Sequence, residues 1–110
     1  MKKGELWIAG FPFRKGREQS GKRPVIVIAD TKTSVAIVIP LTSNLEAIQR
    51  FSYVLEIKKS EENKLEKDSA ALIFQLQALD KRRFVAKLGV IEQSYIEEID
   101  RTIKDLLKIS

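Results

Sequence analysis

The sequence has 110 residues, 44% of them hydrophobic and 32% charged, a composition typical of one globular domain and not of a disordered chain. It contains no cysteine, which excludes disulfide bonds and thiolate metal sites, and no histidine, so catalysis would depend on carboxylates, Arg, Lys, Tyr or hydroxyl groups. We therefore expect no metal and no cofactor. The net charge of +5 favours an anionic partner such as nucleic acid, although a solvated surface with surplus lysines would give the same value.

The apolar runs of the chain are short. The longest, Val25–Ala29 and Val35–Leu41, cannot span a bilayer, and no apolar run of signal-peptide length follows Met1. These features predict a cytoplasmic protein that does not enter a membrane.

The first half of the chain alternates short apolar runs with polar segments, as β-strands and their connections do. A long loop that is polar, basic and rich in glycine separates the first two predicted strands. The expected elements are a strand at 5–9, the loop at 10–22, a buried strand at 24–29, a turn at 30–33 and a strand at 35–41.

The second half continues this pattern and ends in one amphipathic helix. We expect strands at 52–57, 70–76 and 84–88, a charge-rich loop at 58–68, a helical turn at 79–83 and a helix at about 93–108. The helix shows isoleucine and leucine at spacings of three and four residues, and Ser94 with Glu97 fits a capping box. The whole pattern predicts a mainly β fold, a strongly bent antiparallel sheet or partial barrel that is covered by the helix.

The junction between the long loop and the second strand contains the strongest candidate for a binding residue. Pro24 restricts Arg23 to an extended conformation and can begin a strand without a ladder hydrogen bond. An arginine held there suits a phosphate group, because its guanidinium offers five donors in a rigid fork. Glu18, five residues earlier, could face Arg23 as part of a site or could form only a surface ion pair.

Two further segments carry polar side chains next to buried runs. Thr42, Ser43 and Asn44 follow the third strand and could bind a phosphate or a base edge, although they also suit an ordinary turn. Gln75 could point from a strand into a groove, while Asp80 could cap the next helical turn. The basic run 81–83 could attract an RNA backbone or could be a solvated face.

Taken in order, these segments resemble the MazF/PemK family of toxin–antitoxin ribonucleases. Residues 16–24 are similar to the family's loop pattern Gly-x-Glu-Gln-x-Gly-x-Arg-Pro and match it without a gap. Residues 4–7 resemble its first strand, residues 40–42 its Pro-x-Thr strand end, and residues 68–80 its later passage Gln-x-x-x-[Ile/Leu]-Asp. The resemblance covers nearly the whole chain as one domain, residues 1–110, and the loop motif is its most specific part.

The resemblance implies an SH3-like barrel, a homodimer, and sequence-selective cleavage of single-stranded RNA by attack of a ribose 2′-OH on the neighbouring phosphate. It assigns Arg23 as the phosphate clamp, Thr42 as a donor to the phosphate and Glu18 as the candidate base. The proton for the leaving 5′-oxygen would come from the arginine or from water. It also implies a cognate antitoxin with an acidic tail. The side chains expected to hold RNA are Gln19, Lys22, Ser43, Asn44 and Gln75.

Three positions depart from the family pattern. Phe74 stands where an acidic residue is usual, Gln77 where Arg or Lys is common, and Gly10 where an Asp is common. The fold and the general activity are expected to survive these changes. Any role of the usual residues in cutting or in base choice does not carry over to this chain.

Two other classes of function compete with the ribonuclease. A non-enzymatic, gyrase-poisoning toxin of the CcdB type would share the fold but would not be expected to carry the loop motif around Arg23. An inactive RNA-binding barrel would bind RNA and leave it intact, and Phe11 and Phe13 could then be exposed stacking residues, unless they pack against the barrel. Degradation of bare RNA in the presence of EDTA would identify the ribonuclease, and binding of RNA that stays intact would identify the inactive barrel.

Overall fold

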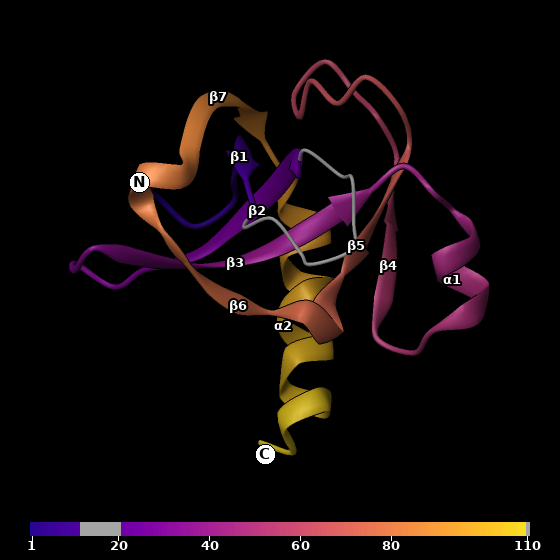
Figure 1. Ribbon diagram of the computed structural model, residues 1–110. Coiled ribbons are helices and arrows are strands. Elements are labelled where there is room, and N and C mark those ends of the chain that lie inside the picture. The colour runs from indigo at the N-terminus through magenta and orange to yellow at the C-terminus, as the bar shows by residue number, and fades with distance from the viewer. Residues whose placement is uncertain (12–20, 110) are drawn as a thin grey trace, which may run out of the picture.

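The computed structural model describes residues 1–11 and 21–109 and shows a seven-stranded antiparallel sheet with one long helix (Figure 1). The strands are β1 (Glu5–Gly10), β2 (Lys22–Asp30), β3 (Val35–Thr42), β4 (Val54–Ile57), β5 (Ser69–Leu72), β6 (Gln77–Asp80) and β7 (Phe84–Val90). The helices are α1 (Glu46–Arg50) and α2 (Gln93–Leu107), and two 3-10 turns are η1 (Ile73–Gln75) and η2 (Lys81–Arg83). No helix in the described ranges is long and apolar enough to cross a membrane.

Strand β3 is the centre of the sheet. The strand order is β4-β5-β3-β2-β1-β7, and β6 also pairs with β3. Shifts of register between β2 and β3 and between β1 and β7 mark bulges, which bend strands and increase their twist. The sheet therefore curves into a barrel-like shape, although no ladder among the described strands closes it. The predicted mainly β class with a covering C-terminal helix is confirmed.

The segment after β5 differs from the prediction. The predicted strand at 70–76 ends at Leu72, and η1 turns the chain so that β6 can pair with another part of the same β3 edge. The helical turn predicted at 79–83 is only η2, because residues 77–80 form β6. Asp80 does cap that turn, as its carboxylate accepts a hydrogen bond of 2.8 Å from the backbone N–H of Arg82.

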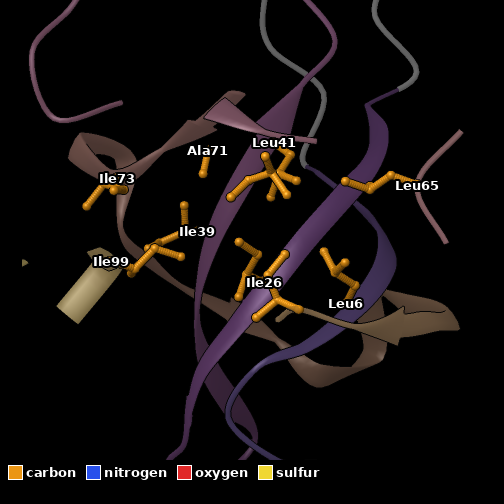
Figure 2. Packing of buried hydrophobic residues seen from close by; sticks show 10 residues of the cluster. Leu6, Ile26, Ile39, Leu41, Leu65, Ala71, Ile73 and Ile99 are labelled. Carbon is orange, nitrogen blue, oxygen red and sulfur yellow. The ribbon is translucent and has the colours of Figure 1, made fainter. Parts of the chain in front are cut away.

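Alternation along the central strands sends apolar side chains to both faces of the sheet, and Figure 2 shows the larger of the two resulting clusters. Ile39 and Leu41 of β3 join the larger cluster with Ile99 of α2, whereas Ala36 and Val38 join a smaller cluster near Trp7. Both faces of β3 are thus covered, which explains the continuous β-branched run in the sequence.

Helix α2, labelled in Figure 1, confirms the predicted amphipathic helix, and its apolar residues pack in the larger cluster. Ile99 is fully buried, whereas Leu107 is 51% exposed at the helix end. The predicted capping box is wrong. Glu92 is the N-cap residue, and no side chain caps the helix. Its carboxylate instead accepts hydrogen bonds from Ser60 and Asn63, in the loop that precedes β5.

Asn63 holds that loop, residues 58–68, against the start of α2. Its side chain is fully buried, and its Oδ1 accepts hydrogen bonds of 3.0 Å from the backbone N–H groups of Ser60 and Leu65. Its Nδ2 donates to the Lys58 carbonyl at 2.9 Å and to Glu92 Oε1 at 3.1 Å. Every polar atom of the amide is therefore used, and the loop has a defined path.

Gly89 of β7 lets this loop approach the sheet. A Cβ atom at this position would lie 2.6 Å from the carbonyl oxygen of Glu62 and 2.8 Å from that of Asn63. The close approach explains why the strand has a glycine there, since any side chain would push the loop away.

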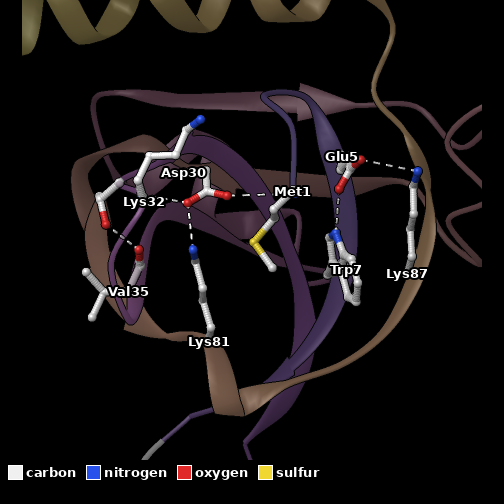
Figure 3. Close-up of polar contacts among 9 residues, drawn as sticks. Met1, Glu5, Trp7, Asp30, Lys32, Val35, Lys81 and Lys87 are labelled. Atoms are coloured by element: carbon white, nitrogen blue, oxygen red, sulfur yellow. Dashed lines mark hydrogen bonds and ion pairs between the residues drawn. The ribbon is translucent and has the colours of Figure 1, made fainter.

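A second polar cluster ties together three segments at the turn between β2 and β3 (Figure 3). Asp30 Oδ1 accepts hydrogen bonds from Lys81 Nζ at 2.6 Å and from the Lys32 backbone at 2.8 Å. The amino terminus at Met1 lies 3.8 Å from Oδ2. The hydrogen bond from Lys81, followed by that from Lys32, lowers the pKa of Asp30 to about 2.

This cluster predicts a loss of stability in acid. The pKa of Asp30 is 3.8 when unperturbed and about 2 in the folded protein, so its contribution is present above pH 4, shrinks as the pH falls from about 4, and is lost below about 2. Asp30→Asn is expected to melt at a lower temperature than the wild type at pH 7, with a difference that shrinks below pH 4 and vanishes below about pH 2. Thermal melts over this range, with Glu61→Gln as a control, test this. A constant difference at every pH would contradict it.

Candidate functional site

Two hollows on the surface meet at Arg23 and Thr42. Arg23 lies at the start of β2 and Thr42 at the end of β3. The two strands are antiparallel and pair Val25 with Pro40, so the start of β2 lies beside the end of β3. The first hollow has a volume of about 500 Å³ and the second about 400 Å³, and both are lined by Arg23 and Thr42. Because they share these two residues, we call the hollows the two arms of a groove, which is lined by residues from five or more segments.

Arg23 is positioned by its neighbours on three sides. Its backbone pairs with Ala9 of β1, and Pro24 follows it in the strand, as predicted. Its guanidinium carbon lies 5.5 Å from the centre of the Phe11 ring, within the range of a cation–π contact. Phe11 itself packs against the smaller core cluster, so the structure supports the packing role for it over an exposed stacking role. Phe13 lies outside the described residues.

Thr42 lines both arms of the groove. Its Oγ1 accepts a hydrogen bond of 3.2 Å from the backbone N–H of Asn44, and this leaves the hydroxyl proton for a ligand. Asn44 in turn uses its Oδ1 to accept from the Glu46 backbone at 3.1 Å, which leaves its amide N–H groups as donors. Asn44 lines the second hollow and Ser43 the first. The segment is thus a turn and part of the site at once.

Gln75 lines the second hollow from η1 and is exposed. It was expected to point from a strand, but the 3-10 turn presents it instead. Gln77, one of the departures from the family pattern, donates from its Nε2 to the Gln75 carbonyl at 3.0 Å. The side chain at position 77 therefore supports the turn that presents Gln75.

The predicted site residues fall into three groups. Lys22 and Ser43 line the first hollow, Asn44 and Gln75 the second, and Arg23 and Thr42 both. Glu18 and Gln19 lie outside the described residues, so their predicted roles stay predictions. No cluster of three or more His, Cys, Asp or Glu residues that could hold a metal ion occurs in the described part of the chain.

Sequence reasoning missed several residues of the groove. Lys64 and Lys67 line the first hollow from the loop at 58–68, which Asn63 holds in place. Arg50 and Phe51 line the second hollow at the end of α1, a helix that was not predicted. The lysines alternate with acidic residues in the sequence, so they carried no local signal of a binding surface.

The charges along the groove are mainly positive. Among the described residues, three lysines, Arg23 and the single carboxylate of Glu66 line the first hollow. The second is lined by Arg23 and Arg50 and by no carboxylate among the described residues. Clefts lined by one sign of charge concentrate oppositely charged ligands. This arrangement suits a polyanionic chain that passes through both arms, with one phosphate at Arg23 and Thr42.

Comparison with known proteins gives a consistent picture. Residues 2–107 match the family model described as PemK-like, MazF-like toxin of type II toxin-antitoxin system. The chain is 32% identical over 107 residues to a protein named Endoribonuclease MazF from Staphylococcus saprophyticus. The alignment covers 94% of this chain and 88% of the relative. The chain is 31% identical over the same length to the protein of that name from Staphylococcus epidermidis, with the same coverage.

Solved structures share the fold. MazF from Deinococcus radiodurans superposes with a TM-score of 0.78 at 21% identity. The superposition covers 99% of this chain and 97% of the Deinococcus chain. A mycobacterial endoribonuclease in complex with its cognate antitoxin gives a TM-score of 0.71 at 13% identity, with 98% of this chain and 95% of the other covered.

Proposed function

The chain belongs to the PemK-like, MazF-like toxins of type II toxin–antitoxin systems, and from this we propose that it is a sequence-selective endoribonuclease that cleaves single-stranded RNA without a metal. The observation that carries the proposal is the positive groove whose two arms meet at Arg23 and Thr42. Curated relatives that are more than 30% identical over most of the chain bear the name Endoribonuclease MazF, which supports the same activity.

The proposed reaction is an attack of a ribose 2′-OH on the adjacent phosphate. The 2′-oxygen loses its proton to a base, for which Glu18 is the candidate, and bonds to phosphorus. The bond from phosphorus to the 5′-oxygen breaks, and the products are a cyclic phosphate and a 5′-hydroxyl. This route needs charge stabilisation on the phosphate oxygens and a held geometry, and it needs neither a histidine nor a metal.

Arg23 and Thr42 supply the charge stabilisation in this proposal. Arginine is a poor proton donor, so in this proposal Arg23 acts electrostatically on the phosphate, and water supplies the proton for the leaving 5′-oxygen. The Thr42 hydroxyl donates to a phosphate oxygen. Gln19, Lys22, Ser43, Asn44 and Gln75 hold the flanking nucleotides.

The proposal includes the partners and the setting of a toxin. Solved relatives include MazE–MazF from Deinococcus radiodurans, which has a TM-score of 0.71 and 21% identity to this chain. We propose for this chain an antitoxin with an acidic, extended tail that occupies the positive groove, a homodimeric state, a single domain over residues 1–110, and a cytoplasmic location. The net charge of +5 is compatible with an acidic partner.

The first experiment incubates the purified protein with a long single-stranded RNA in excess EDTA and maps the cut ends. Cleavage at a short recurring sequence, with cyclic phosphate and 5′-hydroxyl ends, is the expected result. A folded protein that leaves the RNA intact in EDTA and also with added divalent ions would overturn the endoribonuclease assignment. Cleavage only with added ions would overturn the metal-independent mechanism.

The lysines of the first hollow give a further prediction. Replacing Lys64 and Lys67 with alanine is expected to weaken RNA binding at low salt and to reduce the slope of log K against log salt by about 1.4, since each phosphate contact on a single strand contributes about 0.7. Binding titrations at several salt concentrations measure this slope. Lys58→Ala with Lys59→Ala is the control of equal charge in the same loop, because neither lysine lines the hollow. Equal slopes for the two double variants would contradict the prediction.

A further inference from the structure

Two exposed phenylalanines sit at one end of the second hollow. Phe51 is 47% exposed and Phe74 is 37% exposed, and their ring centres lie 5.1 Å apart with a tilt of 38°. Phe51 follows α1, Phe74 belongs to η1, and the backbone N–H of Phe74 donates to the Tyr53 carbonyl at 3.3 Å. The fold therefore holds together two aromatic rings that are 23 positions apart in the sequence, yet leaves both open to solvent.

The surroundings of these rings are positive. The guanidinium carbon of Arg50 lies 5.6 Å from the centre of the Phe51 ring, and Arg23 lines the same hollow. No carboxylate among the described residues lines it. A hollow with aromatic faces and arginines matches the chemistry of a nucleotide, whose base has a π face and whose phosphate is an anion.

The hollow is also continuous with the centre of the proposed reaction. Arg23 and Thr42 line it together with the two phenylalanines, so a strand with its scissile phosphate at Arg23 passes an adjoining nucleotide into this arm. Gln75 follows Phe74 in η1 and lines the same hollow, where its amide can both donate to and accept from the edge of a base.

We propose that Phe51 and Phe74 form a stacking platform for one unpaired base next to the cleaved bond, and that Gln75 selects that base by its edge. The proposal rests on the proposed ribonuclease function and deepens it, because it names residues that determine sequence preference. Stacking by itself tolerates every base, so discrimination comes from the amide. The phenylalanine at position 74, where the family pattern has an acid, is thus part of the recognition surface of this chain.

The test uses a short RNA that spans the mapped cut site and has a 2′-deoxy sugar at the attacking position, which prevents cleavage. Each nucleotide in turn is replaced by an abasic residue, and the Kd of each abasic RNA is compared with that of the intact RNA by fluorescence anisotropy. For the wild type, one abasic position beside the cut is expected to weaken binding about 5- to 150-fold, the size of one base–aromatic stack. For Phe51→Leu with Phe74→Leu, the same position is expected to cost less than twofold.

Two further variants sharpen the result. Phe74→Tyr keeps a ring and should retain the wild-type abasic profile, and Val85→Ala removes an exposed apolar side chain that lines neither hollow. Gln75→Ala should keep the cost of the abasic position but lose the preference among the four bases there. The double leucine variant should raise KM more than it lowers kcat, since stacking holds the bound strand before and during the reaction.

An unchanged abasic profile in the double leucine variant would overturn the platform. A change in oligomeric state of the double leucine variant, measured by light scattering, together with a retained abasic profile would also overturn it. A second copy of the chain would then be what covers the two rings. Failure of the wild type to cut RNA is a separate outcome. It overturns the proposed function, whereas wild-type cleavage with an unchanged profile overturns only the platform.

Discussion

Replacing Arg23 with alanine is expected to lower the rate of RNA cleavage about 100- to 1,000-fold, the effect of removing one donor from a charge-stabilising site. Arg23 lines both arms of the groove, as Thr42 does, and its guanidinium is held at the loop–strand junction above Phe11. Gel analysis of RNA cut under single-turnover conditions measures the rate.

Two comparisons separate loss of the site from loss of charge or fold. Arg23→Lys keeps the charge but not the planar fork, so it should recover only part of the activity. Arg82→Ala removes the same charge at a position outside both hollows, where the side chain is 90% exposed and pairs with Asp80. This variant should cut RNA at nearly the wild-type rate. If Arg23→Ala, with an unchanged melting temperature, cut RNA within threefold of the wild type, Arg23 would not be the phosphate clamp.

Asn63→Ala is expected to destabilise the protein by about 3 kcal/mol. Each buried group that loses its partner costs about 1–3 kcal/mol, and this change strands the backbone N–H groups of Ser60 and Leu65. It also removes a donor to Glu92 at the start of α2. For a domain of this size the melting temperature should fall by about 12–24 °C, measured by circular dichroism.

A nearby exposed position gives the matched control. Glu61→Ala lies in the same loop, and it should change stability by less than about 0.5 kcal/mol, as surface substitutions usually do. The Asn63 change should also lower RNA affinity below the melting transition, because the loop carries Lys64 and Lys67 to the groove. Equal melting temperatures for the two variants would show that the buried amide does not hold the loop.

The pKa of Glu92 belongs to the same network. Burial raises the pKa of this carboxyl, but hydrogen bonds from Ser60 and Asn63 contribute to a net pKa below its usual range. Glu92 is the N-cap residue of α2, and its carboxylate binds a loop 29 or more residues away. The capping-box prediction failed because the helix begins at Gln93, so Ser94 lies inside the helix and not at its N-cap.

The sequence by itself determined the features that depend on neighbouring residues. The buried strands around Val25 and Ile39 follow from continuous apolar runs, and α2 follows from apolar residues at spacings of three and four. The constrained position of Arg23 before Pro24 follows from the stereochemistry of proline, and the loop pattern around it placed the chain in its family. These features were sufficient to predict the fold class and six site residues that the structure places along the groove, from Lys22 to Gln75.

Only the tertiary structure decided which distant segments share the groove. Strand β5 ends at Leu72, and the chain turns there so that β6 pairs along the same edge of β3. The paired residues of β3 and β6 are about 40 positions apart in the sequence. That turn brings Phe74 against Phe51, and the buried Asn63 brings two lysines to Arg23. The physical reason is that burial produces the periodic patterns in a sequence, and solvent-exposed side chains have no such pattern. Long-range strand pairing and loop packing fix the positions of these exposed side chains.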